Sequence, residues 1–327
     1  MVNRVLSWII DATSDVSVNS FDRLMAINYR ILYLITRVLL GKILGKQKRD
    51  RSVLFQKLHK GNYVNPTFLG KIYFYRFLGF FGSKKNMVEV YVKKFDYKVM
   101  CPLNEIDYIS LVSREDSIIS RFNPMEGDIV VDIGAHLGRY TIISSKKVGE
   151  KGKVISIEAN PDVFRTLVDN IRLNMLNNVI LLNCAVYSEK SRVKFYVKGD
   201  DNLENNHYGT LMDNIGNFES KGLKNVLDMD ANSLDNLLLE NSISRTDIKW
   251  IKIDVEGAEL EVLKGSVKIL SNSTKLSILV EIHKLSNGNN HYNSITNFLT
   301  KFGFRIEYQE THETGEIHVI FTNKILK

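Results

Sequence analysis

The sequence has few cysteines and no long uncharged apolar run. Its 2 cysteines are too few for a disulfide framework, and Cys101 and Cys184 lack the short paired spacing of a zinc site. A reducing compartment therefore suits the chain, with both cysteines as small buried residues. No uncharged apolar run approaches the ~20 residues that span a bilayer, and the opening lacks the features of a secretory signal. We therefore expect a cytoplasmic protein rather than a conventional transmembrane protein.

Charge is distributed unevenly along the chain. Residues 1–95 hold 17 Lys and Arg against 5 Asp and Glu, whereas the remaining residues hold 27 against 32. The length and the ordinary apolar content predict one large core and an accessory region. We expect residues 1–87 to form a basic, mainly helical N-terminal extension and residues 88–327 to form the main domain. A basic extension on a mildly acidic domain suggests that the extension contacts an anionic surface.

If the segment Leu24–Leu44 of the extension forms a helix, that helix is apolar on almost every face. Arg23, Arg30 and Arg37 recur every seven residues and would form a narrow basic stripe on it. The helix either packs on the domain or on a second copy of the chain, as in a homodimer, or lies in a membrane interface with its Arg heads near lipid phosphates. Basic and aromatic stretches that follow favour the membrane, so residues 20–85 are a candidate for peripheral binding to the inner face of a membrane. Both interpretations stay open.

Strand-like and helical segments alternate in the main domain. A hairpin is expected over 88–100, strands at 127–134, 153–161, 178–186, 249–257, 276–283, 304–310 and 316–323, and helices at 137–147 and 163–174. This order predicts an α/β fold, a Rossmann-like doubly wound, mostly parallel sheet that ends in an antiparallel hairpin and binds ligands at the carboxyl ends of its strands. Residues 198–232 are rich in Asn, Asp and Gly, and we expect a substrate-side loop there.

Small residues follow the first strand of the predicted sheet. Asp132, Gly134 and Gly138 stand where the strand should end and a helix begin, in a turn whose backbone amides can approach a ligand closely. A second acid, Glu158, ends the next strand, where Rossmann-like folds bind ribose hydroxyls. The dinucleotide motif G-x-G-x-x-G would need two more glycines, at positions that hold a histidine and an arginine. The spacing therefore favours S-adenosylmethionine, which carries no phosphate.

Five segments, in their order and spacing, resemble the signatures of FkbM-type methyltransferases. They are GDIVVDIGAHLGRYT (127–141), ISIEANPDVFRTLVDNIRLN (155–174), NCAVYSEKSRVKFYV (183–197), IKWIKIDVEGAELEVLKGS (248–266) and ILVEIH (278–283), and IKIDVEGAE is the most specific part. The resemblance runs from about residue 115 to the C-terminus and does not cover residues 1–95. It implies a class I S-adenosylmethionine-dependent enzyme that methylates hydroxyl oxygens of sugars, polyketides and related metabolites.

The resemblance also implies which residues bind the cofactor. Asp132, Gly134 and Gly138 would hold its methionine end, Glu158 the ribose and Asn183 to Ala185 the adenine rim, with His136, Thr141 and Asn160 as further contacts. Two departures from the family pattern are visible. His136 stands where the family often has a smaller or polar residue, and 206–211 matches a serine-containing loop only loosely, with Thr210 as the counterpart.

Methyl transfer from a sulfonium requires an aligned acceptor oxygen and removal of its proton. Asp254 and Glu256 end one predicted strand, and Glu281 and His283 end the strand expected beside it. Alternation puts each pair on one face of its strand, so the two pairs can converge at the methyl group. Asp254 and His283 are the leading candidates for the general base or for orienting the substrate. Alternatively, Glu256 caps the next helix and Glu281 pairs with a cation.

Metal binding is a weaker interpretation of the same four residues. Carboxylates and imidazoles bind divalent ions, but nothing in the spacing demands one, and no metal ligand is predicted. The other histidines form no ligand pattern. His312 and His318 are among those expected at the surface or in packing.

These observations predict an O-methyltransferase that acts on a hydroxyl of a sugar, a glycan or a lipid-linked glycan. The first alternative is an RNA methyltransferase, because a basic extension also suits RNA. No RNA-binding motif is recognisable, and aromatic residues within an apolar helix fit lipid better, so nucleic acid is not favoured as a partner. The second alternative is a non-catalytic, membrane-associated scaffold with a methyltransferase fold. Retention of Asp132, Glu158, Asp254 and His283 together argues against the scaffold.

Overall fold

The structure is a computed structural model that describes residues 87–102, 115–198, 209–210, 223–283, 290–312 and 315–324. The chain divides into two compact units between Ser117 and Ile118. In the first, β1 (Met87–Val92) and β2 (Tyr97–Pro102) pair antiparallel around a short 3-10 turn, η2 (Lys93–Phe95), as the sequence predicted. The predicted helix at 24–44 and the rest of the basic extension lie outside the described residues. Within the described part, none of the helices has the length and apolar character to cross a membrane.

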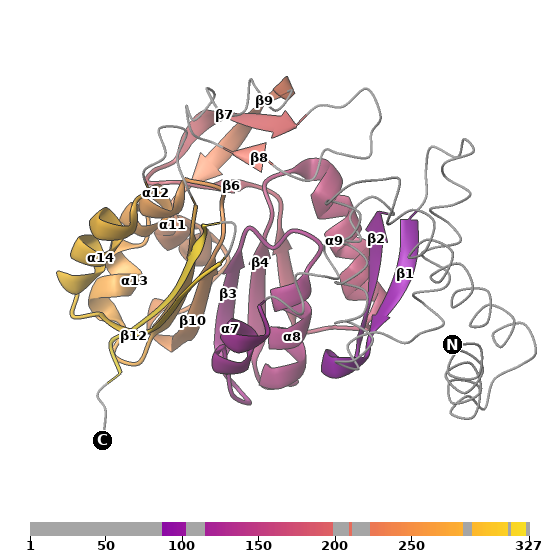
Figure 1. The fold of residues 1–327 in the computed structure, drawn as a ribbon, viewed down its shortest axis with the longest axis horizontal. Coiled ribbons are helices and arrows are strands. Elements are labelled where there is room, and N and C mark those ends of the chain that lie inside the picture. Colours follow the sequence, from indigo (N-terminus) through magenta and orange to yellow (C-terminus); the bar gives the residue numbers. More distant parts are fainter. Residues whose placement is uncertain are drawn as a thin grey trace, which may run out of the picture. The chain divides into compact units, whose positions relative to one another are not determined.

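The second unit is built on a seven-stranded sheet (Figure 1). Its strands are β3 (Ile129–Ile133), β4 (Lys153–Ile157), β5 (Val179–Leu182), β10 (Ile248–Ile253), β11 (Ser277–Ile282), β12 (Arg305–Thr311) and β13 (Ile317–Thr322). Their spatial order is β12-β13-β11-β10-β3-β4-β5. The five strands from β11 to β5 are parallel, and β13 is antiparallel to both of its neighbours. The predicted mostly parallel sheet with a terminal hairpin is therefore confirmed.

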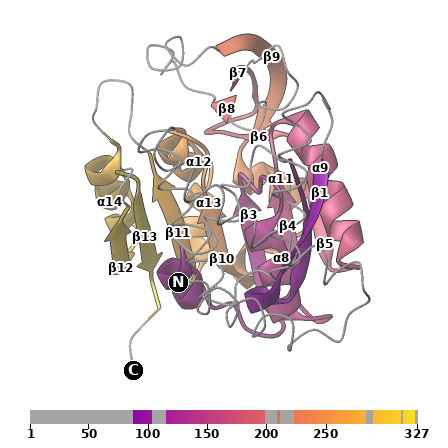
Figure 2. The same cartoon turned by 45° about the vertical axis from the view of Figure 1, so that its right-hand side comes forward.

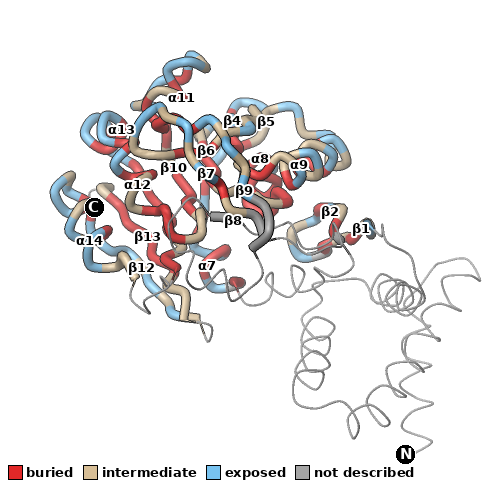
Figure 3. Tube along the Cα trace, turned by 90° about the horizontal axis from the view of Figure 1, so that it is seen from above, coloured by how far each residue is buried: buried red, intermediate tan, exposed pale blue. Residues whose placement is uncertain are grey.

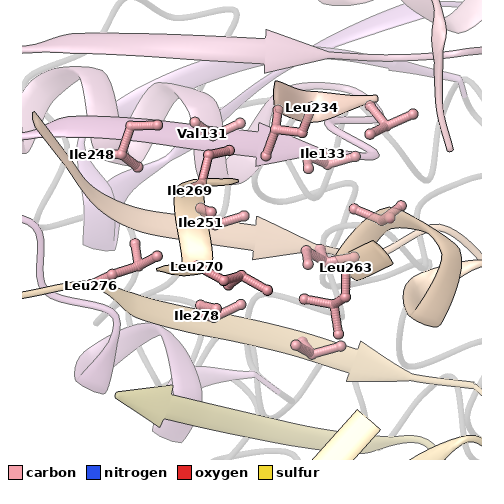
Figure 4. Packing of buried hydrophobic residues seen from close by; sticks show 14 of the residues in the cluster. Val131, Ile133, Leu234, Ile248, Ile251, Leu263, Ile269, Leu270, Leu276 and Ile278 are labelled. Atoms are coloured by element: carbon pink, nitrogen blue, oxygen red, sulfur yellow. The ribbon is translucent and has the colours of Figure 1, made fainter. Parts of the chain in front are cut away.

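Helices cover both faces of this sheet. They are α7 (Asp116–Arg121), α8 (Arg139–Val148), α9 (Pro161–Leu173), α11 (Leu234–Glu240), α12 (Glu259–Lys264), α13 (Val267–Asn272) and α14 (Tyr292–Thr300), with a 3-10 turn, η5 (Arg245–Asp247). Helix α8 lies on the face that carries Asp132, because the Thr141 hydroxyl donates to that carboxylate. Helices α11 to α14 pack on the opposite face, where Val131, Ile251 and Ile278 lie in one buried cluster (Figure 4). The fold is thus doubly wound.

The central strands of the main sheet could be predicted from the sequence because they are buried. Strand β10 is buried along almost its whole length (Figure 3), and β3 and β4 each bury four of five residues. Strands covered on both faces require mainly apolar residues, and Val and Ile predominate in β3 and β4, while β10 also holds Trp250 and two lysines.

A second, smaller sheet lies beyond the carboxyl ends of the main strands (Figures 1 and 2). It contains β6 (Ala185–Val186), β7 (Ser191–Lys198), β8 (Gly209–Thr210) and β9 (Leu223–Asn232), in the order β6-β9-β7-β8.

The prediction of a loop over 198–232 is wrong for 223–232, which form β9 and pair antiparallel with β7. Within β9, Asp228 and Asp230 are exposed whereas Leu227 and Met229 are partly buried. The period-2 pattern of a strand is therefore present, but acidic residues obscured it. The two-stranded ladder with β7 supplies the backbone hydrogen bonds that stabilise it.

Candidate active site

The turn after β3 touches the end of β10. Gly134 has φ +73°, and a Cβ at this position would lie 1.7 Å from the backbone oxygen of Asp254. The Gly134 carbonyl accepts a hydrogen bond from Lys252 Nζ at 2.9 Å. Only glycine fits this backbone, both for its conformation and for the space available. The predicted cofactor turn and the predicted catalytic strand end are consequently in direct contact.

Gly138, at the start of α8, is constrained by packing as well as by conformation. It has φ +93°, and a Cβ would lie 2.7 Å from Leu167 Cδ1 on α9. The sequence suggested that glycine leaves room for a ligand here. The structure gives a further reason, the close approach of α9.

Asp132, near the end of β3, is buried with one carboxylate oxygen satisfied. Thr141 Oγ1 donates to Oδ2 at 2.6 Å and lies 2.7 Å from the hydroxyl of Ser156 on β4. Burial raises the pKa of Asp132, while Lys252 and the Thr141 hydrogen bond oppose the rise. Oδ1 has no hydrogen-bond partner among the described residues and lies 3.7 Å from Lys252 Nζ. A buried acceptor of this kind suits a ligand amine or hydroxyl donor.

Glu158 follows β4 and is held by two backbone amides. The amides of His136 and Asn160 donate to its two carboxylate oxygens, each at 2.8 Å. Burial raises the pKa of Glu158 to about 7, although both hydrogen bonds favour the charged form. The carboxylate is therefore fixed in orientation and changes its charge near neutral pH.

The remaining predicted cofactor residues organise the turns around Glu158. The Asn160 side chain accepts from the amide of Asp162 and caps α9. Asn183 Nδ2 donates to the backbone oxygens of Glu158 and Ala159 at 2.8 and 3.1 Å. Ala185 is buried at the start of β6. The Asn183 side chain thus holds the backbone that presents Glu158, and the Asn160 side chain fixes the start of α9.

The four predicted catalytic residues lie together around one imidazole nitrogen. His283 Nε2 is 3.7 Å from Asp254 Oδ1, 3.7 Å from Glu256 Oε1 and 3.6 Å from Glu281 Oε1. The residues come from the ends of β10 and β11, which are neighbours in the sheet. The structure therefore brings the two pairs together as the strand alternation indicated.

Two further residues of this cluster were missed from the sequence. Lys252 is 5% exposed at its side chain, lies 3.0 Å from Asp254 Oδ2, and connects that carboxylate to Asp132. Glu259 Oε1 lies 2.8 Å from His283 Nδ1. Lys252, two residues before Asp254 at the end of a buried strand, was a visible signal, because alternation puts both on one face. The approach of Glu259 depends on the packing of α12.

The charges within the cluster shift the pKa values of its members, and these shifts indicate which member can accept a proton. Burial alone would raise the pKa of Asp254, but Lys252 and His283 lower it to about 2. Burial opposes protonation of His283, yet Glu256 and Glu259 hold its pKa well above the usual value. Burial and the neighbouring carboxylates raise the pKa of Glu256 to about 7, against the effect of His283. Glu256 is therefore the member whose basicity best matches neutral pH.

The sequence also suggested structural roles for two of these acids, helix capping by Glu256 and cation pairing by Glu281. Glu256 has φ +54°, an uncommon conformation for a residue other than glycine. The N-cap residue of α12 is Ala258, which makes no side-chain cap, and the Gly257 amide donates to Glu259. Glu281 does meet a partner that can be cationic, since its Oε2 lies 2.9 Å from His318 Nε2.

The expectation that His312 and His318 belong to no ligand pattern needs correction, whereas the expected packing position is what the structure shows for His318. His318 is 2% exposed, and its Nδ1 lies 2.7 Å from His312 Nε2. Glu310 lies beside both, since β12 and β13 pair in a register that the sequence does not reveal. Among the residues that the structure describes, two groups are of metal-ligand type, Glu310 with the two histidines and Asp254 with Glu256 and His283, each with its ligand atoms within 4.8 Å of one another.

Comparison with known proteins identifies the family. The model of the methyltransferase FkbM domain matches residues 132–306, more than half of the chain. The chain belongs to the FkbM methyltransferase family. Residues 132–306 of this FkbM family member thus form a domain of the S-adenosylmethionine-dependent methyltransferase type, and the resemblance found in the sequence is confirmed.

Two curated relatives of this FkbM protein match over part of their length. Hexuronic acid methyltransferase AglP of Haloferax volcanii is 28% identical over 158 residues, which cover 48% of this chain and 57% of the relative. Methyltransferase sdnD of Sordaria araneosa is 27% identical over 156 residues, covering 42% and 59%. The chain thus spans less than two thirds of either relative. A solved S-adenosylmethionine-dependent methyltransferase from Aquifex aeolicus is 15% identical with a TM-score of 0.39, over 63% of this chain and 88% of that one.

The residues described above fit the family's cofactor. Asp132 has a buried carboxylate oxygen without a hydrogen-bond partner in the described part of the chain, and Glu158 presents an oriented carboxylate. These acceptors suit the amino group and the ribose hydroxyls of S-adenosylmethionine. The turn at Gly134, made without a pyrophosphate motif, lies between them in sequence.

Proposed function

We propose that this enzyme transfers a methyl group to a hydroxyl oxygen of a sugar, a glycan or a lipid-linked glycan. The named activity of AglP, hexuronic acid methylation, supports a carbohydrate acceptor. The acids beside the cofactor turn support hydroxyl methylation, because a hydroxyl must lose its proton as the oxygen attacks.

The observation that carries this proposal is the contact between two turns. The backbone at Gly134 lies against the backbone oxygen of Asp254, so the proposed cofactor turn adjoins the cluster of Asp254, Glu256, Glu281 and His283. A group held by the first turn can therefore react with an acceptor held by the second. Transfer between them requires that the two sites be adjacent.

In this mechanism the chain's own residues bind, orient and accept a proton. Asp132 would hold the amino group of the cofactor and Glu158 its ribose, and the cofactor would supply the methyl group on a sulfonium when bound. Glu256 Oε1 accepts the proton of the attacking hydroxyl. The protonated imidazole of His283 stays beside Glu256, 3.7 Å away, and balances the negative charge of the cluster. Lys252 holds Asp254 as an anion, so Asp254 orients the acceptor rather than taking its proton.

An acceptor screen tests this function. The full chain is incubated with methyl-labelled S-adenosylmethionine and separate panels of hexuronic acids, neutral sugars, lipid-linked glycans and total tRNA. We expect label in a carbohydrate panel, its loss with Glu256→Gln, and wild-type transfer by Glu126→Gln, whose side chain is 71% exposed. Label only in tRNA would refute the carbohydrate acceptor and support an RNA methyltransferase, the alternative suggested by the basic extension.

Peripheral membrane binding through residues 20–85 is a further part of the proposal. It rests on the Arg23, Arg30 and Arg37 stripe in the sequence. Sedimentation of the full chain with anionic liposomes should decrease when the three arginines are changed to glutamine, and should weaken with salt. Equal sedimentation of both proteins would contradict membrane binding by this stripe. A mass of two chains by light scattering would instead support the homodimer.

A further inference from the structure

Three neighbouring strands place acids and histidines side by side. Glu281 on β11 lies directly opposite His318 on β13, and His318 lies directly opposite Glu310 on β12. His312 follows Glu310 by two residues, so both point to the same face of the sheet. The register thus gathers four side chains of metal-ligand type at the hairpin.

The distances among three of these side chains match metal coordination. His318 Nδ1 is 2.7 Å from His312 Nε2, which is 3.3 Å from Glu310 Oε1, and the remaining distance, from Oε1 to Nδ1, is 3.9 Å. Ligands at 2.0–2.1 Å from a tetrahedral ion stand about 3.3–3.4 Å apart. Shifts of a few tenths of an ångström would therefore equalise the three distances around an ion.

We propose that Glu310, His312 and His318 form a binding site for a divalent transition-metal ion, with Zn²⁺ the best match. Two imidazoles and one carboxylate are typical ligands of zinc and of related ions. The side chains are 17%, 13% and 3% exposed, so the ion would be shielded and would keep one coordination position for water or a ligand. Without an ion, the two facing ring nitrogens must share a proton, which metal binding would displace.

Outer contacts hold these ligands in the orientation that coordination requires. His318 Nε2 faces Glu281 Oε2 at 2.9 Å, which leaves its Nδ1 directed at the proposed ion. The Tyr308 hydroxyl donates to Glu310 Oε2 at 2.8 Å, so the other oxygen, Oε1, faces the histidines. Metal-binding histidines and carboxylates commonly have such partners. Both contacts lie outside the set of three ligands.

The ion would also fix one wall of the active site. By holding His318, it would keep Glu281 Oε1 beside His283 Nε2, at the 3.6 Å seen here. This consequence rests on the proposed function, whereas binding of the ion does not.

Calorimetric titration of the metal-stripped full chain with ZnCl₂ tests the site, and Co²⁺ absorption gives a second readout. We expect one site on the wild type and the same affinity in Glu307→Gln, a matched control on the exposed side of β12. His312→Gln and Glu310→Gln should each weaken binding at least about 100-fold, and Tyr308→Phe about 10- to 100-fold. Ligand-field bands of tetrahedral Co²⁺ should disappear with the first two.

Glu256→Gln separates this site from the catalytic cluster. If the proposal is correct, it leaves Zn²⁺ affinity unchanged even if it abolishes methyl transfer. Loss of Zn²⁺ binding in Glu256→Gln but not in His312→Gln would place the ion in the cluster and overturn the proposal. Absence of binding by the wild type would overturn it as well. Neither outcome depends on the identity of the methyl acceptor.

Discussion

Cofactor affinity should depend on the ionisation of Glu158. Its pKa is raised by burial to about 7, from an ordinary value of 4.5. Ribose hydroxyls donate hydrogen bonds, so they favour the carboxylate over the neutral acid. Deprotonation on going from low to high pH therefore increases affinity.

The magnitude follows from the fraction of molecules that are ionised. With a pKa near 7, about one tenth of the molecules carry the carboxylate at pH 6 and about nine tenths at pH 8, and the apparent Kd scales inversely with that fraction. The Kd for S-adenosylhomocysteine should consequently fall about tenfold between pH 6 and pH 8, which corresponds to about 1.4 kcal/mol. Isothermal titration calorimetry at several pH values measures this Kd directly.

Two variants assign the effect to Glu158. Glu158→Gln should bind S-adenosylhomocysteine more weakly and without this pH dependence, whereas Glu256→Gln, which removes the other acid with a pKa near 7, should keep it. A wild-type Kd that changes less than twofold between pH 6 and pH 8, with the protein folded throughout, would refute the reasoning.

Two stability predictions concern the contact between the turns. Gly134→Ala should lower the free energy of unfolding by more than about 4 kcal/mol, because its Cβ would lie 1.7 Å from the Asp254 oxygen. The control Gly127→Ala, at a residue with φ +85° and no atom within 4 Å of the added Cβ, should cost only about 1–2 kcal/mol. Urea denaturation measures both losses, and equal losses would contradict the role of the Asp254 contact. Lys252→Met leaves Asp132 and Asp254 without their buried cation and should cost about 3–5 kcal/mol by the same assay. A loss below about 1 kcal/mol would show that the pairing contributes little.

The sequence predicted the main sheet because its strands are buried on both faces. A run such as the Ile and Val residues of β3 leaves little ambiguity. The juxtaposition of Asp254 with His283 was also predictable, since the strand ends that carry them belong to neighbouring parallel strands. Strand β9 was missed because a strand with one exposed face holds acidic residues at alternate positions.

Other features of the site depend on tertiary contacts. The approach of His318 to Glu281 requires that β13 pair with β11 in one particular register, which no local pattern specifies. The order of basicity within the cluster also required the structure. Asp254 was preferred from the sequence, but the buried Lys252 ammonium removes its basicity, while burial raises that of Glu256.

Methyl transfer by Glu256→Gln tests the central claim most directly. Labelled transfer to the acceptor found in the screen is measured at saturating cofactor from pH 6 to pH 8. Because the ionised carboxylate is the base, wild-type activity should rise through an apparent pKa near 7. At pH 8 the variant should be at least about 100-fold slower, without that rise. Transfer at the wild-type rate by Glu256→Gln would contradict the claim that this carboxylate accepts the proton.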